Sequence, residues 1–403
     1  MNILYLTTSF PRKKDGDTIY TDLAEELIKK GHIVTVCVAD QNLTIPFEYL
    51  IERDLIQYRI KVPKYYNVNL FMKGISILLQ PFYIKRSLRK IEGLSNYGVI
   101  LYEAPPISNM SIVKWLKRRT RAKSYLMLKD IFPQNAIDLE IIKRNSLIHG
   151  YFRNKEKKLY EVSDIIGCMS PNNMEYLLTH NSINSNKVKY FPNTKAINKY
   201  NANDDFVSIR NKYGIPLNSK VFIFGGNMGK PQYMDLHKKA IIHYKDSKKI
   251  FFVFVGRGTD RYIIEETINN YSIENTLLLC EIHRDDYEKL VLASDVGLIS
   301  LNPLFTIPNY PSRILSYMEY AKPILAATDS VTDIRELIKE SNSGFWVNSN
   351  DYNGYIDIIG EIIESRNLID LGRNARQYFL DNFTVDKSVI YLETHIEEVK
   401  NDV

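Results

Sequence analysis

Residues 309–318, which read Asn-Tyr-Pro-Ser-Arg-Ile-Leu-Ser-Tyr-Met, combine residue types that can bind phosphate. Pro311 and Ser312 before an apolar-periodic run predict a helix start, where backbone N–H groups and the positive end of the helix dipole are available. Such a start can bind phosphate, and Arg313 would add a planar charge suited to a diphosphate. The same residues could instead form an ordinary surface helix whose serine is a cap.

Two glycine-rich turns, each with a cation, follow predicted strands upstream. They are Gly225-Gly226-Asn227-Met228-Gly229-Lys230 and Gly256-Arg257-Gly258. Glycine lets the backbone approach a ligand closely, so these turns and Arg313 could together neutralise a diphosphate without a metal ion. Neither turn matches G-x-G-x-x-G or the P-loop, which disfavours a nicotinamide-dependent enzyme. The seven histidines show no metal-ligand spacing, and no G-x-S-x-G motif is present.

Two acidic residues and a glycine loop occupy comparable positions in the first half of the chain. Glu103 and Asp130 each follow a predicted strand, and Gly16 lies in the polar loop after the first strand. Doubly wound folds bind ligands at the carboxyl ends of their strands, so either carboxylate could be a general base and the loop could contact a ligand. Each carboxylate could instead be a cap or turn former, and the loop an ordinary solvated turn.

Apolar runs alternating with helical patterns predict the elements that position these residues. The predicted strands are residues 2–7, 33–38, 97–102, 124–128, 165–169, 188–191, 221–224, 250–255, 277–280, 296–301 and 324–327. Alternation with helices, such as one at residues 19–30, is typical of α/β proteins with doubly wound parallel sheets. We therefore expect two such domains, with ligand loops at the strand ends facing an interdomain cleft.

Length and composition set the domain boundaries. A chain of 403 residues exceeds one compact core, and the asparagine-rich stretch at residues 195–205 suits a linker. We predict domains at residues 1–195 and 206–375. The helical pattern at residues 368–399 is too long for one more layer of the second domain, so residues 376–403 are predicted to cross back to the first.

Charge and cysteine usage restrict the class of protein. Residues 1–200 carry 31 Lys and Arg against 18 Asp and Glu, whereas the remainder carries 22 against 29, which indicates modules with different partners. Cys37, Cys168 and Cys280 lie far apart inside apolar runs, as reduced core thiols do. No apolar run approaches the length of a spanning helix and the N-terminus leads directly into a strand, so we expect a cytoplasmic protein.

Residues 55–91 contain no acidic residue and interleave aromatic with basic side chains. Apolar positions recur there at helical spacing, at Leu70, Phe71, Ile75, Leu78, Leu79 and Phe82. This pattern predicts a basic amphipathic segment resting on an anionic membrane surface. A second basic cluster at residues 114–123 could add up to about 1 kcal/mol per charge. A solvated helix face and a single-stranded nucleic-acid site are the alternatives, and no recognised nucleic-acid motif accompanies the charge.

With these motifs in order, the chain resembles the GT-B glycosyltransferases of family 4 (glycosyltransferase group 1). The resemblance rests on Gly-Asn-x-Gly-Lys at residues 226–230, Val-Gly-Arg-Gly at 255–258 and Pro-Ser-Arg-Ile-Leu-Ser-Tyr-Met-Glu-Tyr-Ala-Lys-Pro at 311–323. It is closest to bacterial O-antigen and capsule transferases for amino-deoxy sugars such as fucosamine. It implies an α/β GT-B architecture of two Rossmann-like domains, the second holding a nucleotide-sugar donor, usually UDP-linked, and the first an acceptor.

The resemblance also implies roles for individual residues. The residues implied at the donor are Gly16, Gly226, Asn227, Lys230, Arg257, Ile282, Arg284, Pro311, Ser312, Arg313 and Ser316. Lys230 and Arg257 would stabilise the departing diphosphate, so they are predicted to be catalytic together with Glu103 and Asp130, which would face the acceptor. The family's usual glutamate pair falls on Pro308 and Ser316 here, and its usual arginine and lysine fall on Asn227 and Gln232.

The sequence therefore predicts a metal-independent, retaining transferase without a cofactor. It would move an N-acetylated amino-deoxy sugar from UDP to a lipid-linked saccharide for capsule or O-antigen, at the inner face of the cell membrane, with no nucleic-acid partner. A UDP-sugar epimerase of the same fold is one alternative. A non-catalytic transferase-like subunit is another, which the missing glutamates favour and the phosphate-binding positions oppose.

Overall fold

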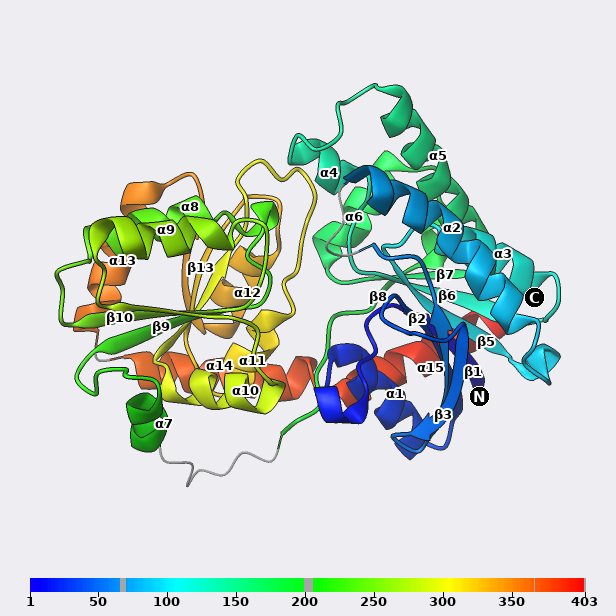
Figure 1. Ribbon diagram of the computed structural model, residues 1–403, viewed down its shortest axis with the longest axis horizontal. Helices are drawn as coiled ribbons and strands as arrows, with labels where there is room; N and C mark the ends of the chain where they lie inside the picture. The colour runs from blue at the N-terminus through cyan, green and yellow to red at the C-terminus, as the bar shows by residue number, and fades with distance from the viewer. Residues whose placement is uncertain (66–69, 199–205, 366, 402–403) are drawn as a thin grey trace. The chain divides into compact units, whose positions relative to one another are not determined.

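The computed structural model describes residues 1–65, 70–198, 206–365 and 367–401. The chain forms two compact units, each built on one sheet (Figure 1). The first unit is Met1–Ala196 together with Val385–Val403, and the second unit is Ile197–Thr384.

The first unit contains an eight-stranded sheet in the order β3-β4-β2-β1-β5-β6-β7-β8. Its strands are β1 (Asn2–Thr7), β2 (Ile33–Asp40), β3 (Phe47–Glu52), β4 (Leu55–Lys61), β5 (Val99–Ala104), β6 (Lys123–Leu128), β7 (Ile165–Cys168) and β8 (Val188–Tyr190). All neighbouring pairs are parallel except β3 with β4, which form an antiparallel hairpin. The parallel strands read as nearly continuous apolar runs because helices cover both faces.

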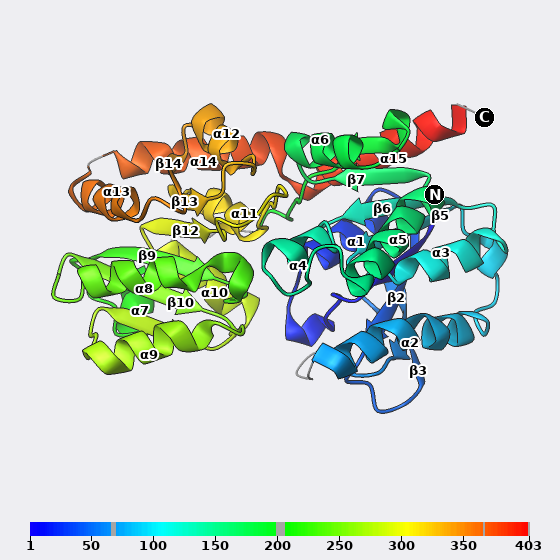
Figure 2. The ribbon, with the colours of Figure 1, turned by 90° about the horizontal axis from the view of Figure 1, so that it is seen from above.

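Helices α1 (Ile19–Lys29) and α15 (Val385–Asn401) pack together on one face of this sheet (Figure 2). The other helices of the unit are α2 (Leu70–Leu88), α3 (Asn109–Lys117), α4 (Gln134–Asp138), α5 (Leu147–Val162) and α6 (Pro171–His180). The C-terminal helix α15 buries Val389, Leu392 and Ile396 in the core. A hydrogen bond of 2.9 Å joins its His395 Nδ1 to the Tyr125 hydroxyl, so α15 completes the first unit.

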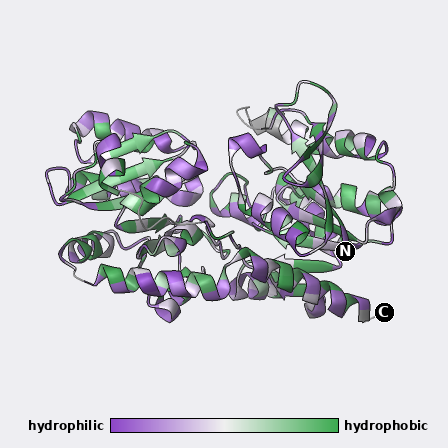
Figure 3. Cartoon of the chain, turned by 90° about the horizontal axis from the view of Figure 1, so that it is seen from below, coloured by the Kyte–Doolittle hydropathy of each residue, from purple (hydrophilic) through white to green (hydrophobic). Residues whose placement is uncertain are grey.

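The second unit contains a six-stranded parallel sheet in the order β11-β10-β9-β12-β13-β14. Its strands are β9 (Lys220–Gly225), β10 (Ile250–Val255), β11 (Thr276–Leu279), β12 (Val296–Ser300), β13 (Ile324–Thr328) and β14 (Gly344–Asn348). Its helices are α7 (Phe206–Lys212), α8 (Met234–His243), α9 (Arg261–Tyr271), α10 (Arg284–Ala293), α11 (Arg313–Glu319), α12 (Ile334–Ser341), α13 (Tyr352–Glu364) and α14 (Leu368–Asn382). Its strands are mostly hydrophobic (Figure 3), and Phe224 packs against Phe254 with ring centroids 6.0 Å apart.

Every predicted strand is present, with ends shifted by at most two residues. Strands β3, β4 and β14 are absent from the prediction. The β3–β4 hairpin turns at Arg53 and Asp54, both with positive φ (61° and 58°), where glycine or asparagine is the usual signal of such a turn. The long helical pattern at residues 368–399 is two helices, and the change of unit lies at Val385 rather than at residue 376.

The predicted basic segment at residues 55–91 is wrong over its first part. Residues 55–61 form β4, where Arg59 is buried and donates to the carbonyl of Phe10 (2.8 Å) and to Asp40 (3.2 Å). The helix predicted from the apolar spacing is α2, and residues 66–69 of the segment lie outside the described residues. The second basic cluster is partly neutralised, because Lys117 pairs with Asp164 at 2.7 Å.

Two further expectations concern cysteines and the membrane. Cys37 and Cys168 are buried as expected, but Cys280 is exposed just beyond β11, so the prediction of a core thiol is wrong there. Among the helices of the described ranges, none combines the length and the apolar character needed to cross a bilayer.

Candidate functional site

The carboxyl ends of β9 and β10 are held together through glycine. The N–H of Gly226 donates to the carbonyl of Val255 (2.9 Å), and that of Met228 donates to the carbonyl of Arg257 (2.6 Å). Gly256 has a φ of 145°, and a Cβ there would lie 1.9 Å from the carbonyl oxygen of Gly226. Only glycine permits this approach of the two turns.

Arg313 lies beside the first of these turns. Its guanidinium stacks 4.3 Å over the Phe224 ring and lies 3.7 Å from where a Cβ on Gly226 would be. Burial lowers the pKa of Arg313, and only Tyr317 and Tyr287 oppose that shift. Within the described parts of the chain no carboxylate pairs with it, and its buried Nη1 has no hydrogen-bond partner. Since burying an unpaired charge is costly, the surroundings of Arg313 are those of an anion site.

Side chains below the turn fix its shape. Gln232 Oε1 accepts from Asn227 Nδ2 (3.0 Å) and from the N–H of Gly229 (3.3 Å). The carbonyl of Gln232 accepts from Ser300 Oγ (2.5 Å), which is also hydrogen-bonded to His237 Nε2 (2.8 Å). Burial, together with the charge of Arg313, lowers the pKa of His237 to about 3, so this imidazole is neutral at neutral pH. No pattern in the sequence pointed to Ser300 or His237.

Asn227 and Lys230 occupy different situations in this turn. The Asn227 amide donates a hydrogen bond to Gln232. Asn227 and Gln232, the two positions where the resembled family carries cations, are therefore hydrogen-bonded to each other here. Lys230 is exposed at the start of the 3-10 turn Lys230–Gln232. Its ammonium is therefore available to a ligand lying over the turn.

Helix α11 begins at Arg313, shortly after the predicted start at Pro311, and has seven residues. Ser312 is exposed and accepts no capping hydrogen bond, so the ordinary serine cap is not formed. The preceding loop is tied to the loop between β13 and α12, because the N–H of Asn309 donates to Thr332 Oγ1 (3.1 Å). Ser316, where the family carries a glutamate, is partly exposed on the same helix as Arg313.

The other residues predicted at the donor already have partners or lie on the rim. Arg257 is exposed and pairs with Glu281 at 3.0 Å, and Arg284 pairs with Glu288 at 2.9 Å along α10. Ile282 is partly exposed in the loop between β11 and α10. Arg313 thus differs from Arg257 and Arg284, because no carboxylate among the described residues pairs with it.

At the carboxyl edge of the first unit, Glu103 links β5 to the loop after β1. Its Oε1 accepts from Thr7 Oγ1 (3.1 Å), from the N–H of Thr8 (2.8 Å) and from Thr8 Oγ1 (3.0 Å). Burial raises the pKa of Glu103, whereas these hydrogen bonds and Lys129 lower it. This geometry holds the β1 loop in place.

Asp130 follows β6 and is partly exposed. Burial raises its pKa to about 6, opposed by hydrogen bonds from Asn135 Nδ2 and from the N–H of Ile131 (2.8 Å). The neighbouring Lys129, which the sequence did not single out, donates to Asn193 Oδ1 (2.8 Å), and burial lowers its pKa to about 8. A carboxylate that titrates near pH 6 suits a proton acceptor.

Gly16 lies in the first unit, in a loop held by Arg53. The guanidinium of Arg53 donates to the carbonyl of Gly16 (2.6 Å) and pairs with Asp17 (2.5 Å) and Glu25 (2.6 Å). Arg53 sits in the unpredicted β3–β4 turn, so its role could not be anticipated. In the described ranges no group of three or more His, Cys, Asp or Glu side chains is placed to hold a metal ion.

The chain is similar to known glycosyltransferases. Residues 205–378 match the family model described as glycosyl transferases group 1, a range that contains both glycine turns and Arg313. A relative described as probable glycosyltransferase WbjE of Pseudomonas aeruginosa is 24% identical over 336 residues, which covers 80% of each chain.

Solved structures with the same fold cover the whole chain. Sucrose-phosphate synthase from Thermosynechococcus elongatus aligns with a TM-score of 0.77 and 12% identity over 100% of both chains. Anabaena HepE, solved in complex with UDP and glucose, aligns with a TM-score of 0.70 and 16% identity over 97% of this chain and 98% of its own. These likenesses confirm the predicted α/β fold with two Rossmann-like domains of the GT-B type.

Proposed function

Because residues 205–378 match the family model of group 1 glycosyl transferases, we propose that this protein transfers a sugar from a UDP-sugar to a lipid-linked saccharide. One observation carries the proposal: the Arg313 guanidinium lies against the Gly226 turn with its Nη1 buried, and no carboxylate among the described residues pairs with it. A nucleoside diphosphate brings the charge that this cation lacks and can lie against bare backbone at Gly226. UDP is proposed because similar HepE was solved with UDP and glucose.

Stabilisation of the leaving group is the main catalytic effect in this proposal. As the bond between the anomeric carbon and the diphosphate breaks, negative charge builds on UDP, and Arg313 and Lys230 neutralise it. A preorganised donor of this kind is worth about 10²–10³ in rate. The proposed mechanism needs no metal ion, because two cations and the backbone turns supply the positive potential.

The acceptor hydroxyl must lose a proton as its oxygen bonds to the anomeric carbon, on the face that UDP leaves if the configuration is retained. We assign Asp130 as the proton acceptor, because its pKa of about 6 leaves it ionised at neutral pH yet still basic. Glu103 is assigned a positioning role, because three hydrogen bonds already occupy its Oε1. Arg257, bound to Glu281, is proposed to border the donor on the rim.

The finer features of the proposal come from the family resemblance. They are an N-acetylated amino-deoxy sugar, retention of anomeric configuration, and a role in capsule or O-antigen synthesis at the inner face of the cell membrane. The exposed apolar side chains of α2 support a membrane-facing role for the first unit, since Leu78 is 55% and Phe82 is 62% exposed.

Thermal unfolding with a panel of UDP-sugars tests the proposal. A donor at 100 times its Kd should stabilise the protein by about 2.7 kcal/mol, whereas uridine at the same concentration should not. The stabilising donor is then incubated with and without a membrane lipid extract, and sugar incorporation into lipid is measured. Failure of every UDP-sugar to stabilise the protein would refute the proposal, and epimerised sugar formed without lipid would identify an epimerase instead.

A further inference from the structure

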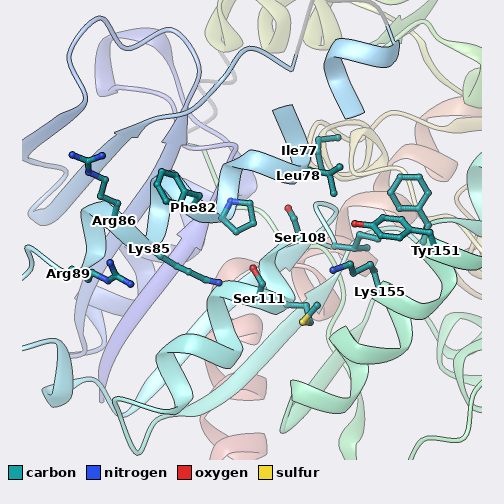
Figure 4. A pocket seen from close by; sticks show the side chains of 14 residues that line it. Ile77, Leu78, Phe82, Lys85, Arg86, Arg89, Ser108, Ser111, Tyr151 and Lys155 are labelled. Atoms are coloured by element: carbon teal, nitrogen blue, oxygen red, sulfur yellow. The ribbon is translucent and has the colours of Figure 1, made fainter. Parts of the chain in front are cut away.

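The first unit contains an open pocket of about 570 Å³ between α2, α3 and α5 (Figure 4). This volume is in the range of small-molecule sites. Neither Glu103 nor Asp130 nor any residue assigned to the donor is among the described residues that line it. The pocket therefore needs its own explanation.

The charge in this pocket has one sign. Among the described residues that line it there are four cations, Lys85, Arg86, Arg89 and Lys155, and no carboxylate. Burial lowers the pKa of Lys85, and Arg89 and Lys155 lower it further. Lys85 and Lys155 extend from α2 and α5 toward Ser108 and Ser111 (Figure 4). Like charges held together without a counterion favour an anionic ligand.

A buried hydroxyl at the pocket also has no partner. Ser108 Oγ makes no hydrogen bond within the described chain, and Ser108 directly precedes α3. Phosphate oxygens accept hydrogen bonds from ammonium and hydroxyl groups alike. The polar part of the pocket thus offers donors without acidic acceptors, which suits a phosphate group.

The remaining wall is apolar and open to the outside. Leu78 and Phe82 on α2 and Tyr151 on α5 line the pocket and are 55%, 62% and 43% exposed. The apolar surface continues along α5 through Leu147 and Ile148, which are 95% and 60% exposed. Exposed apolar residues gathered next to cations that have no carboxylate beside them in the described lining match a ligand with a phosphate head and a hydrocarbon chain.

We propose that this pocket binds a phosphorylated lipid, with the phosphate between Lys85 and Lys155 and the hydrocarbon chain along Leu78, Phe82 and Tyr151. The proposal rests on the proposed function only where it identifies this lipid as the carrier of the saccharide acceptor. Binding itself requires neither donor nor transfer.

Binding is tested with farnesyl diphosphate below its micellar concentration, measured by calorimetry without any UDP-sugar. The wild-type protein should bind one equivalent. The double variant K85S/K155S should weaken binding at least about ten-fold, because two charge-assisted contacts are lost. The matched control R118S/R121S removes the same charge from exposed side chains beyond the end of α3 and should bind like the wild type.

A third variant tests the apolar wall. F82S alters an exposed side chain, so the fold should persist, and it should weaken farnesyl diphosphate without changing the weak binding of inorganic pyrophosphate. Equal weakening by both double variants would overturn the proposal, as would pyrophosphate binding as tightly as farnesyl diphosphate. UDP affinity measured on the same proteins tests the donor site separately, so the two proposals can fail independently.

Vesicles distinguish a bound lipid from a membrane headgroup. Wild-type protein is sedimented with phosphatidylcholine vesicles, with and without phosphatidylglycerol. If K85S/K155S releases the protein from anionic vesicles while farnesyl diphosphate in solution does not bind the wild type, the cations contact the membrane surface and the pocket proposal is wrong. Binding in solution with the stated dependence on Lys85 and Lys155 supports it.

Discussion

The carboxyl edges of the two sheets are built around opposite charges. In the second unit, Arg313 is a partly buried cation with a buried Nη1, and the described chain offers it no carboxylate. In the first unit, Glu103 accepts hydrogen bonds at Oε1 and is influenced by Lys129, while its buried Oε2 has no partner in the described chain, and Asp130 accepts from Asn135 and Ile131. The second edge therefore favours an anion, whereas the carboxylates of the first edge suit a neutral acceptor hydroxyl.

Two arginines of the second unit sharpen this contrast. Arg210 is also buried, but its guanidinium donates to the carbonyl of Ala293 (2.9 Å) and pairs with Asp295 (2.9 Å). Its further contacts are to loop carbonyls before β9. Arg210 thus stabilises the fold, while Arg313 has the features of a residue kept for a ligand.

The largest expected effect comes from replacing these two arginines by methionine. R313M should lower the rate of sugar transfer by about 10²–10³ without lowering the melting temperature, because it removes a partly buried charge that has no carboxylate partner among the described residues. R210M should instead lower the free energy of unfolding by about 3 kcal/mol, because it leaves buried carbonyls without a donor and removes the ion pair with Asp295. Rate and melting temperature are measured on both variants. Equal destabilisation by R313M and R210M would contradict the distinction between a ligand-binding and a structural arginine.

The next effect concerns the acidic edge of the first unit. The transfer rate should rise with pH through about 6, where Asp130 loses its proton and becomes able to accept another. D130N should lower the rate by about 10² and remove that pH dependence. The rate is measured between pH 5 and 8 on both proteins. A D130N profile that keeps the same acid limb would show that another group is titrating.

The glycine turns give an effect on both stability and binding. A Cβ in G256A would overlap the carbonyl of Gly226, so we expect a loss of about 3 kcal/mol and weaker UDP binding. Gly214 is the matched control, because it also has positive φ (66°) but nothing lies within 4 Å of its added Cβ. G214A should cost about 1 kcal/mol and leave UDP binding intact. Urea unfolding measures the loss of stability, and calorimetry measures UDP affinity. Equal losses of both in G256A and G214A would argue against a close approach of the two glycine turns.

The smallest effect is the acid sensitivity of the second unit. His237 has a pKa of about 3 in the folded protein and about 6.5 when unfolded, so the unfolded chain binds the extra proton between these values. The free energy of unfolding should therefore fall by about 1.4 kcal/mol per pH unit below pH 6.5. Asp130 acts with the opposite sign, because its folded pKa is raised. Comparing the wild type with H237F at pH 7.0 and 5.5 isolates the histidine, and equal slopes would show that His237 is not buried as a neutral group.

The elements of the fold were largely predictable, because buried parallel strands appear as apolar runs whatever their neighbours. The β3–β4 hairpin was not, since Arg53 and Asp54 adopt positive φ without glycine. The glycine turns and Arg313 were visible from residue type and spacing. Which arginines have a carboxylate partner could not be predicted from the sequence. Glu281, Glu288 and Asp295 neutralise other arginines through contacts that only the folded chain establishes.

The α2 segment shows the same limit. Its helical periodicity and lack of acidic residues were readable, whereas the pocket depends on Lys155 and Tyr151 from α5, far along the chain. Lys129 is a similar case, because its partners Glu103 and Asn193 come from other strand ends. The local sequence pattern therefore showed where the cations are. Only the tertiary contacts show which of them are paired within the fold and which are available to a ligand.

Calorimetry of UDP against uridine tests the central claim, that the carboxyl edge of the second unit holds a diphosphate at Arg313. We predict that UDP binds the wild-type protein at least about ten-fold more tightly than uridine, and that R313M abolishes this difference while the protein stays folded. Equal affinities for UDP and uridine in the wild type, or an undiminished preference for UDP in R313M, would contradict it.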